Sequence, residues 1–170
     1  MSVLVITGSA RADSYTRRLG EALAEGLPGG VLAPRLTDLP YFDQDLEASP
    51  PPAVEALRAQ VRAADAVVVV TPEYNGTVSG LLGNAVDWLS RPYGAGSLRG
   101  TRAVAVAASP GEVGGARAVV SLRTLLGNTG AELLGPPITV GGIARVLDTG
   151  AAEVVEQVAE ALDQALAQAA

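Results

Sequence analysis

The sequence predicts an α/β fold in which a doubly wound parallel sheet carries helices on both faces. Short, almost uninterrupted apolar runs alternate along the chain with segments of helical period, the pattern of strands that are buried on both faces. The chain has 170 residues, which suits one domain with a sizeable core and is too short for an eight-stranded α/β barrel. We therefore expect a single domain over residues 1–170.

Five apolar runs are the predicted strands. Three of them are valine-rich, namely Val3–Thr7, Ala66–Thr71 and Thr101–Ala108. Two weaker candidates are Val31–Thr37 and Glu132–Val140, the second of which is interrupted by Pro136-Pro137.

Five amphipathic segments follow these runs and are the predicted helices. Their apolar faces comprise, in order, Tyr15, Leu19, Ala22, Leu23 and Leu27; Val54, Leu57, Val61 and Ala64; Leu81, Leu82, Ala85, Val86 and Leu89; Val119, Leu122, Leu125 and Leu126; and Val154, Val155, Val158, Leu162 and Leu166. Ser14 is expected to cap the first helix, and Gly127 to end the fourth. Strict alternation of five strands and helices favours the flavodoxin-like strand order 2-1-3-4-5.

A ligand of such a sheet binds beyond the carboxyl ends of the strands, where the strand order reverses between the first and third strands. The loops at this edge are the most polar and glycine-rich parts of the chain: Gly8–Thr16, Thr71–Gly80 and Ser109–Gly115. Their composition indicates a ligand site that three loops share.

The first of these loops has the composition of a phosphate cradle. It leads into a helix, whose free N–H groups and dipole favour an anion. Ser9, Ser14 and Thr16 add hydroxyl groups, and Arg11 adds a cation that binds phosphate in bidentate fashion. The alternative is ordinary capping by Ser14 with a solvated Arg11. Neither the dinucleotide nor the P-loop glycine fingerprint is present.

The second and third loops suit a planar heteroaromatic ring. Backbone N–H groups of Glu73–Gly76 and Gly111–Gly115 are candidates for contact with ring carbonyls and nitrogens, and Tyr74 offers an aromatic surface. The alternative is that Asn75-Gly76 is a turn and Gly114-Gly115 a loose helix start. Together, the three loops favour a mononucleotide that carries a ring.

Composition excludes several classes of chemistry. The chain contains no cysteine, histidine or lysine, so a histidine base, a thiol nucleophile, a lysine Schiff base and a Cys/His zinc site are impossible. Catalysis would then depend on a cofactor. The net charge of −6 argues against nucleic-acid and membrane partners, and no apolar stretch approaches the roughly 20 residues that span a bilayer. We expect a soluble cytoplasmic protein.

Motifs along nearly the whole chain resemble the NADPH-dependent FMN reductase family. They are Gly8-Ser9-x-Arg11-x-x-Ser14, Leu39–Leu46, Pro72–Gly76, Asn84–Pro92 and Ser109-Pro110-Gly111 with Gly114–Arg117. The resemblance implies a flavodoxin-like fold, bound FMN, and reduction of a flavin, quinone, azo dye or chromate.

Carried onto this chain, the resemblance assigns each loop a part of FMN. The phosphate would contact Ser9, Arg11, Ser14, Tyr15 and Thr16. The ring would lie against Pro72, Glu73, Tyr74, Asn75 and Gly76, with Ser109, Gly111, Gly114 and Gly115 on its far side. The family usually has lysine at the position of Gly83 and often has asparagine at that of Thr16.

The expected function is FMN-dependent electron transfer from NADPH or NADH to a small acceptor, with a non-enzymatic flavodoxin-type electron carrier as the alternative. A degenerate member that only binds other proteins is a further possibility, which the intact first loop disfavours. The sequence alone reveals no clamp for a 2′-phosphate. Arg17 and Arg18 are candidates for solvated side chains, and the alternative is that either lies near a nicotinamide nucleotide phosphate. We expect a homodimer or tetramer with Tyr41–Leu46 and Leu81–Tyr93 as interface candidates, and Trp88 as a core or subunit-contact residue.

Overall fold

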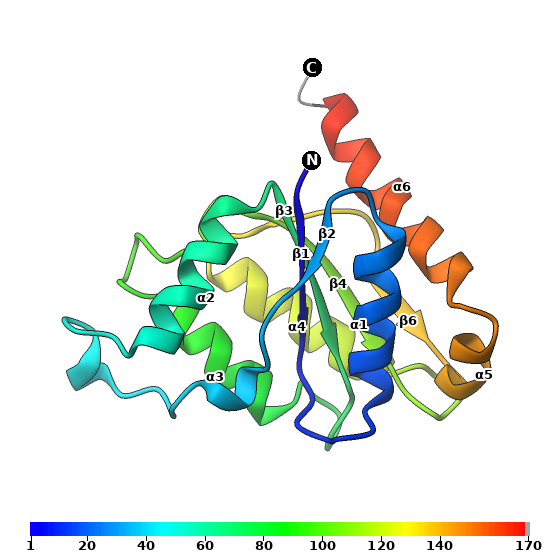
Figure 1. Ribbon diagram of the computed structural model, residues 1–170, viewed down its shortest axis with the longest axis horizontal. Coiled ribbons are helices and arrows are strands. Elements are labelled where there is room, and N and C mark those ends of the chain that lie inside the picture. The colour runs from blue at the N-terminus through cyan, green and yellow to red at the C-terminus, as the bar shows by residue number, and fades with distance from the viewer. Residues whose placement is uncertain (169–170) are drawn as a thin grey trace.

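A parallel sheet with the strand order β2-β1-β3-β4-β5 forms the centre of the protein (Figure 1). The computed structural model describes residues 1–168, with side-chain burial through residue 164, so residues 169–170 of the expected domain and the side chain of Leu166 lie outside the described part. The strands are β1 (Val3–Thr7), β2 (Gly30–Leu32), β3 (Ala66–Thr71), β4 (Arg102–Ala108), β5 (Glu132–Leu133) and β6 (Ile138–Val140). The predicted order 2-1-3-4-5 is confirmed.

The fifth predicted strand is divided into two. β5 pairs with Arg102 and Ala103 at the start of β4, whereas β6 pairs with the end of β4, from Val106 to Ala108. Pro136-Pro137 lies between them, and proline has no N–H group for a ladder hydrogen bond. The two short strands therefore share one edge position of the sheet.

The second predicted strand, Val31–Thr37, is wrong in its second half. β2 ends at Leu32, and a short 3-10 helix, η1, follows at Leu36–Asp38. Pro34 lies between them and cannot donate to the ladder. The chain leaves the sheet there, which places Arg35 beside the end of β1 rather than along the sheet.

The predicted helices are present, and one further helix lies between β6 and the last of them. Their bounds are α1 (Tyr15–Gly26), α2 (Pro52–Ala63), α3 (Gly80–Leu89), α4 (Ala116–Asn128), α5 (Ile143–Asp148) and α6 (Ala152–Gln168), with a second 3-10 turn, η2, at Gln44–Leu46. The predicted cap is confirmed, because the Ser14 hydroxyl oxygen accepts the N–H of Arg17 at 3.1 Å. Gly127 does not end α4, which continues to Asn128; the turn out of it contains Gly130 with φ +83°. No helix within residues 1–168 is long and apolar enough to cross a membrane.

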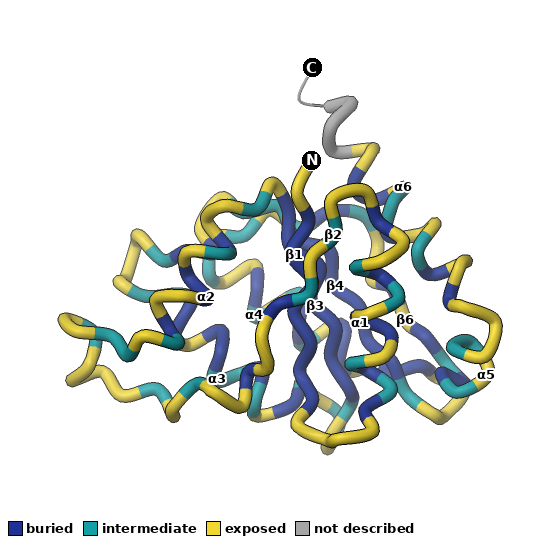
Figure 2. Tube along the Cα trace, viewed as in Figure 1, coloured by how far each residue is buried: buried dark blue, intermediate teal, exposed yellow. Residues whose placement is uncertain are grey.

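Alternate strand residues face two separate hydrophobic clusters. Val3, Val5 and their neighbours on β3 and β4 pack against α1, α5 and α6. Leu4, Ile6 and their neighbours pack against α2, α3 and α4. β1, β3 and β4 are consequently buried along almost their whole length (Figure 2), as their valine-rich runs predict, whereas the edge strands β2 and β5 are only partly buried.

Two side chains of α3 hold the segment before η2 against the body of the fold. The carbonyl oxygen of Pro40 accepts the side-chain N–H groups of Asn84 and Trp88, both at 2.9 Å, and Asn84 Oδ1 accepts the N–H of Phe42 at 2.7 Å. The Phe42 ring meets Trp88 edge to face, with centroids 5.0 Å apart. Trp88 is fully buried within one chain, so it is a core residue.

A buried arginine joins α2 to the end of α3. The guanidinium of Arg58, which is 3% exposed, donates to the carbonyl oxygen of Trp88 from Nε at 3.2 Å and from Nη2 at 2.9 Å. Its Nη1 pairs with Glu55 at 2.6 Å. One charged group thus satisfies a helix C-terminal carbonyl and a carboxylate together.

We expect Arg58→Ala to lower the free energy of unfolding by about 3 kcal/mol, because charged hydrogen bonds are lost in a buried position. Urea denaturation followed by circular dichroism measures the change. Arg62→Ala, on the exposed side of the same helix, is the matched control and should change stability by less than about 0.5 kcal/mol. Equal effects of the two substitutions would contradict the assigned role of Arg58.

Gly83, where the resemblance implies a lysine, occupies an open position of α3. No atom lies within 4 Å of where its Cβ would be, so neither packing nor backbone geometry requires glycine. We expect Gly83→Ala to raise the free energy of unfolding by about 0.5–1 kcal/mol, because glycine weakens a helix interior. Thermal unfolding measures this; a lower melting temperature would show that glycine is required here.

Candidate functional site

The loops that follow β1, β3 and β4 meet at the carboxyl edge of the sheet and enclose a small cavity. Its volume is about 70 Å³, and its lining residues are Ser9, Arg11, Ser14, Tyr15, Thr16, Pro72, Glu73, Tyr74, Ala108, Ser109 and Pro110. The register of the three parallel strands places their ends side by side. The structure therefore brings most of the predicted site residues together and adds Ala108 and Pro110.

Five predicted site residues do not line this cavity. Asn75 and Gly76 form the tip of a tight hairpin turn, with φ of 53° and 75°, between Tyr74 and Thr77. The turn interpretation of this dipeptide is confirmed. Gly111, Gly114 and Gly115 lie in the loop between β4 and α4, outside the lining.

The β1–α1 loop collects hydrogen-bond donors around the cavity. Ser9, Ser14 and Thr16 are buried, and Ser14 uses its oxygen as an acceptor for the helix N–H of Arg17. Among the described residues, the Ser14 hydroxyl accepts a hydrogen bond but donates none, and the Thr16 hydroxyl makes none. The first N–H groups of α1 also lack intrahelical acceptors. Capping by Ser14 is therefore compatible with an anion site at the same helix end.

Arg11 supplies the positive charge of the cavity. Its side chain is exposed and pairs with no carboxylate among the described residues. Its own N–H donates to Ser9 Oγ at 3.4 Å, which closes the loop on itself. An unpaired guanidinium beside a helix N-terminus favours a bound phosphate or carboxylate.

Ser79 links the first loop to the third helix. Its hydroxyl donates to the carbonyl oxygen of Gly8 at 2.5 Å and accepts the N–H of Leu82 at 3.2 Å. Ser79 itself is buried. One side chain therefore caps α3 and fixes the end of β1 relative to that helix.

Glu73 links the second loop to the fourth helix in a way that the sequence did not reveal. Its Oε2 accepts the N–H groups of Arg117 and Ala118, each at 3.2 Å, and its Oε1 lies 3.4 Å from Arg117 Nε. The residue before α4, Gly115, has no side chain to cap the helix. The carboxylate caps it from another loop, a role that local sequence pattern does not signal.

The backbone conformation before α4 explains why two glycines occur there. Gly114 and Gly115 have φ of +65° and +79°, where other residues are strained. A Cβ at Gly114 would lie 2.7 Å from the backbone nitrogen of Gly141. These glycines let the loop turn closely over the end of β6.

A larger cavity, of about 470 Å³, lies between the ends of α3 and α4 and includes Asp87, Arg91 and Arg99. Both helices run antiparallel to the strands, so their last residues lie at the amino edge of the sheet, away from the loops described above. Among the described residues no group of three acidic, histidine or cysteine side chains is placed to hold a metal ion.

Comparison with known proteins indicates the family of the chain. Residues 1–143 match the model of the family described as NADPH-dependent FMN reductase. A quinone reductase of Pseudomonas putida KT2440 is 41% identical over 128 residues, which cover 74% of this chain and 69% of the relative. An NAD(P)H-dependent FMN reductase of Pseudomonas aeruginosa PAO1 is 38% identical over 173 residues, which cover 95% and 93%.

Solved structures show the same architecture. The flavoenzyme NAD(P)H:(acceptor) oxidoreductase FerB of Paracoccus denitrificans has a TM-score of 0.80 and 28% identity, with 96% of this chain and 97% of that chain covered. A flavodoxin mutant from Pseudomonas aeruginosa has a TM-score of 0.61 at 18% identity, with 96% and 99% covered. The second likeness concerns the fold alone.

Removing the Glu73 carboxylate tests its role as a cap. We expect Glu73→Ala to lower the free energy of unfolding by about 1–2 kcal/mol, the usual effect of removing a helix cap. Glu73→Gln should lower the free energy of unfolding by a smaller amount. Amide hydrogen exchange should become faster at Arg117 and Ala118. Glu112→Ala, which breaks the exposed pair of Glu112 with Arg145, is the control and should have little effect. Unchanged exchange at both amides would contradict the capping role.

Proposed function

The chain belongs to the NADPH-dependent FMN reductase family, and from this premise we propose that it binds FMN at the junction of the β1, β3 and β4 loops, as one domain, and reduces a small acceptor with NAD(P)H. The observation that carries the proposal is the cavity at the point where the strand order reverses. It combines the first N–H groups of α1, the hydroxyls of Ser9, Ser14 and Thr16, and Arg11, which pairs with no carboxylate in the part of the chain that the structure describes.

The residues around the cavity fit FMN. Ser9, Ser14 and Thr16, together with Arg11, make a donor set with the chemistry of a phosphate monoester site. The cavity volume of about 70 Å³ suits this headgroup rather than a whole mononucleotide. Pro72, Tyr74 and Pro110 also line it and offer apolar surface for a flavin ring.

Bound FMN supplies the redox chemistry, because it accepts a hydride from a nicotinamide and passes electrons to an acceptor. The chain itself binds and orients. Arg11 and the hydroxyls hold the phosphate, while the loops anchored by Ser79 and Glu73 set where the ring is presented. All fourteen residues assigned from the family pattern are part of this proposal, including Asn75, Gly76, Gly111, Gly114 and Gly115 on the loops that border the cavity.

A quinone is the first acceptor to test. Relatives at 36% and 41% identity bear the name quinone reductase, and free flavins, azo compounds and oxidised metal ions are the other classes. These reductase names favour an enzyme over a non-enzymatic electron carrier. The likeness to a flavodoxin, at 18% identity, carries no argument about activity.

The proposal includes a homodimer or tetramer in the cytoplasm, where nicotinamide nucleotides are available as electron donors. Support for self-association comes from the two candidate interface segments. Tyr41 and Tyr93 are 91% and 90% exposed, and large aromatic side chains are enriched where protein surfaces meet. Trp88 is excluded as a contact residue by its burial.

Arg11→Ala tests the phosphate cradle. We expect the Kd for FMN, measured by quenching of flavin fluorescence, to rise about tenfold or more, because a charged hydrogen bond contributes roughly 1.5–3 kcal/mol. Arg99→Ala, at the opposite edge of the sheet, should leave the Kd unchanged.

Anaerobic titration of the FMN-loaded protein with NADPH and NADH separates an enzyme from a carrier. We expect rapid bleaching of the flavin absorbance and reoxidation by a quinone. A protein that binds no FMN would disprove the proposed function, and a protein that binds FMN but is reduced only sluggishly by both nucleotides would be a carrier.

A further inference from the structure

Positive charge is concentrated around the β1–α1 loop of this acidic protein. Four of the 12 arginines lie there, Arg11, Arg17, Arg18 and Arg35, in a chain whose net charge is −6. Only Arg17 has a carboxylate partner, Glu21, at 3.3 Å. Among the described residues no carboxylate lies within ion-pair distance of the other three. The loop therefore carries more positive charge than its neighbours neutralise.

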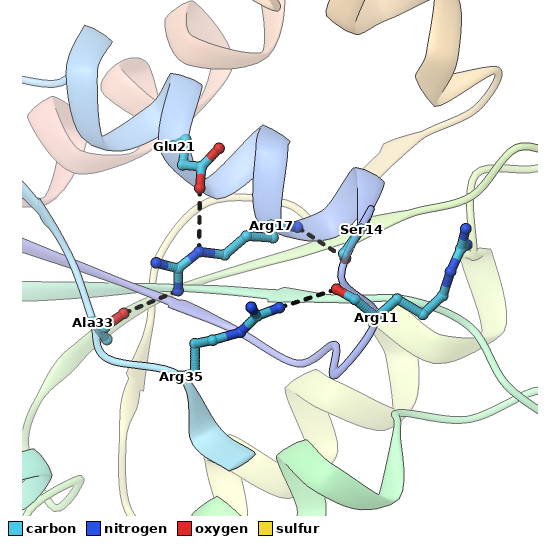
Figure 3. A network of polar contacts seen from close by, with 6 residues as sticks. All are labelled: Arg11, Ser14, Arg17, Glu21, Ala33 and Arg35. Carbon is cyan, nitrogen blue, oxygen red and sulfur yellow. Dashed lines mark hydrogen bonds and ion pairs between the residues drawn. The ribbon is translucent and has the colours of Figure 1, made fainter. Parts of the chain in front are cut away.

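Arg35 follows the carboxyl end of β2 and reaches the β1–α1 loop from there. Its Nη2 donates to the backbone carbonyl oxygen of Arg11 at 3.0 Å (Figure 3). Its Nε and Nη1 make no hydrogen bond to any described residue, and the side chain is exposed. The contact fixes the position of the guanidinium and leaves its other donors available to a ligand.

Arg17 positions the segment that carries Arg35. Its Nη1 donates to the carbonyl oxygen of Ala33 at 3.2 Å, while its Nε pairs with Glu21. The guanidinium groups of Arg17 and Arg35 lie on one side of the loop, whereas the side chain of Arg11 extends on the other (Figure 3). The donors on the Arg35 side are thus separate from the guanidinium assigned to the FMN phosphate.

We propose that Arg35, positioned by Arg17, binds the 2′-phosphate of NADPH and gives the protein a preference for NADPH over NADH. This inference rests on the proposed function, in which FMN and a nicotinamide nucleotide are the two anionic ligands. FMN has a single phosphate, for which Arg11 suffices. NADPH differs from NADH by a phosphate monoester of charge about −1.5 to −2, and the arginine fork matches its oxygens.

Arg18 adds to the same local charge. Its guanidinium lies 5.9 Å from the centroid of the Tyr15 ring, at the start of α1. It is exposed and has no ion-pair partner among the described residues. We assign Arg18 to attraction of the nucleotide and Arg35 to direct recognition, because only Arg35 is hydrogen-bonded to the loop.

The test compares Arg35→Ala with the wild type, both loaded with FMN. Calorimetry with 2′,5′-ADP and 5′-AMP measures recognition without turnover, and steady-state kinetics gives KM for NADPH and NADH. We expect Arg35→Ala to weaken 2′,5′-ADP binding and to raise KM for NADPH, each about tenfold, the effect of losing a charged hydrogen bond. Binding of 5′-AMP, KM for NADH and the Kd for FMN should stay unchanged. Arg35→Lys should recover part of the loss.

Arg62→Ala, which removes an exposed arginine from α2, is the control for net charge and should leave all these values unchanged. Equal effects of Arg35→Ala on both nucleotides, or no effect on either, would overturn the inference while the proposed function stands. Weakened FMN binding would assign Arg35 to the FMN site and overturn it as well. A wild-type protein that neither nucleotide reduces would contradict the proposed function itself.

Discussion

The hydrogen bond from Ser79 to the carbonyl oxygen of Gly8 joins the two loops between which the strand order reverses. It adds to the bond from the Gly8 N–H to the carbonyl oxygen of Val70 and to the bond from the Ser79 N–H to Thr71 Oγ1, which also hold these two loops to the end of β3. Glu73 extends the same constraint to the third loop, because its carboxylate caps α4. Three loops from separate parts of the chain are thus fixed to one another by buried or partly buried side chains, before any ligand binds.

This arrangement suits a protein without histidine, cysteine or lysine. Such a chain can contribute fixed hydrogen-bond donors and charge, while a cofactor contributes reactive atoms. Ser79 and Glu73 hold the loops together, whereas Ser14, Thr16 and Arg11 line the cavity without linking the loops to one another. Loops that are already ordered avoid the entropic cost of ordering on binding. More of the free energy of the hydrogen bonds to a ligand then contributes to its affinity.

The sequence predicts the parts of this structure that follow from local pattern. Valine-rich runs identify β1, β3 and β4, and Ser14 identifies the start of α1, because burial and capping leave periodic or adjacent signals. The parts it does not predict depend on partners far along the chain. Arg58 is 30 residues from the carbonyl of Trp88, Glu73 is 44 from Arg117, and six-residue α5 is too short to show a helical period.

Arg35 shows how a small error in a predicted strand conceals the placement of a charged side chain. In a strand over Val31–Thr37, the side chain of Arg35 would project from one face of the sheet. Instead, Pro34 ends the strand pairing, and the turn that follows places the Arg35 guanidinium against the carbonyl oxygen of Arg11. The position of this guanidinium matters for anion binding because salt screens charges. At physiological ionic strength the screening length is only about 8 Å. The net charge of −6 is spread over the molecule, so the arginines at the loop determine which anions bind there.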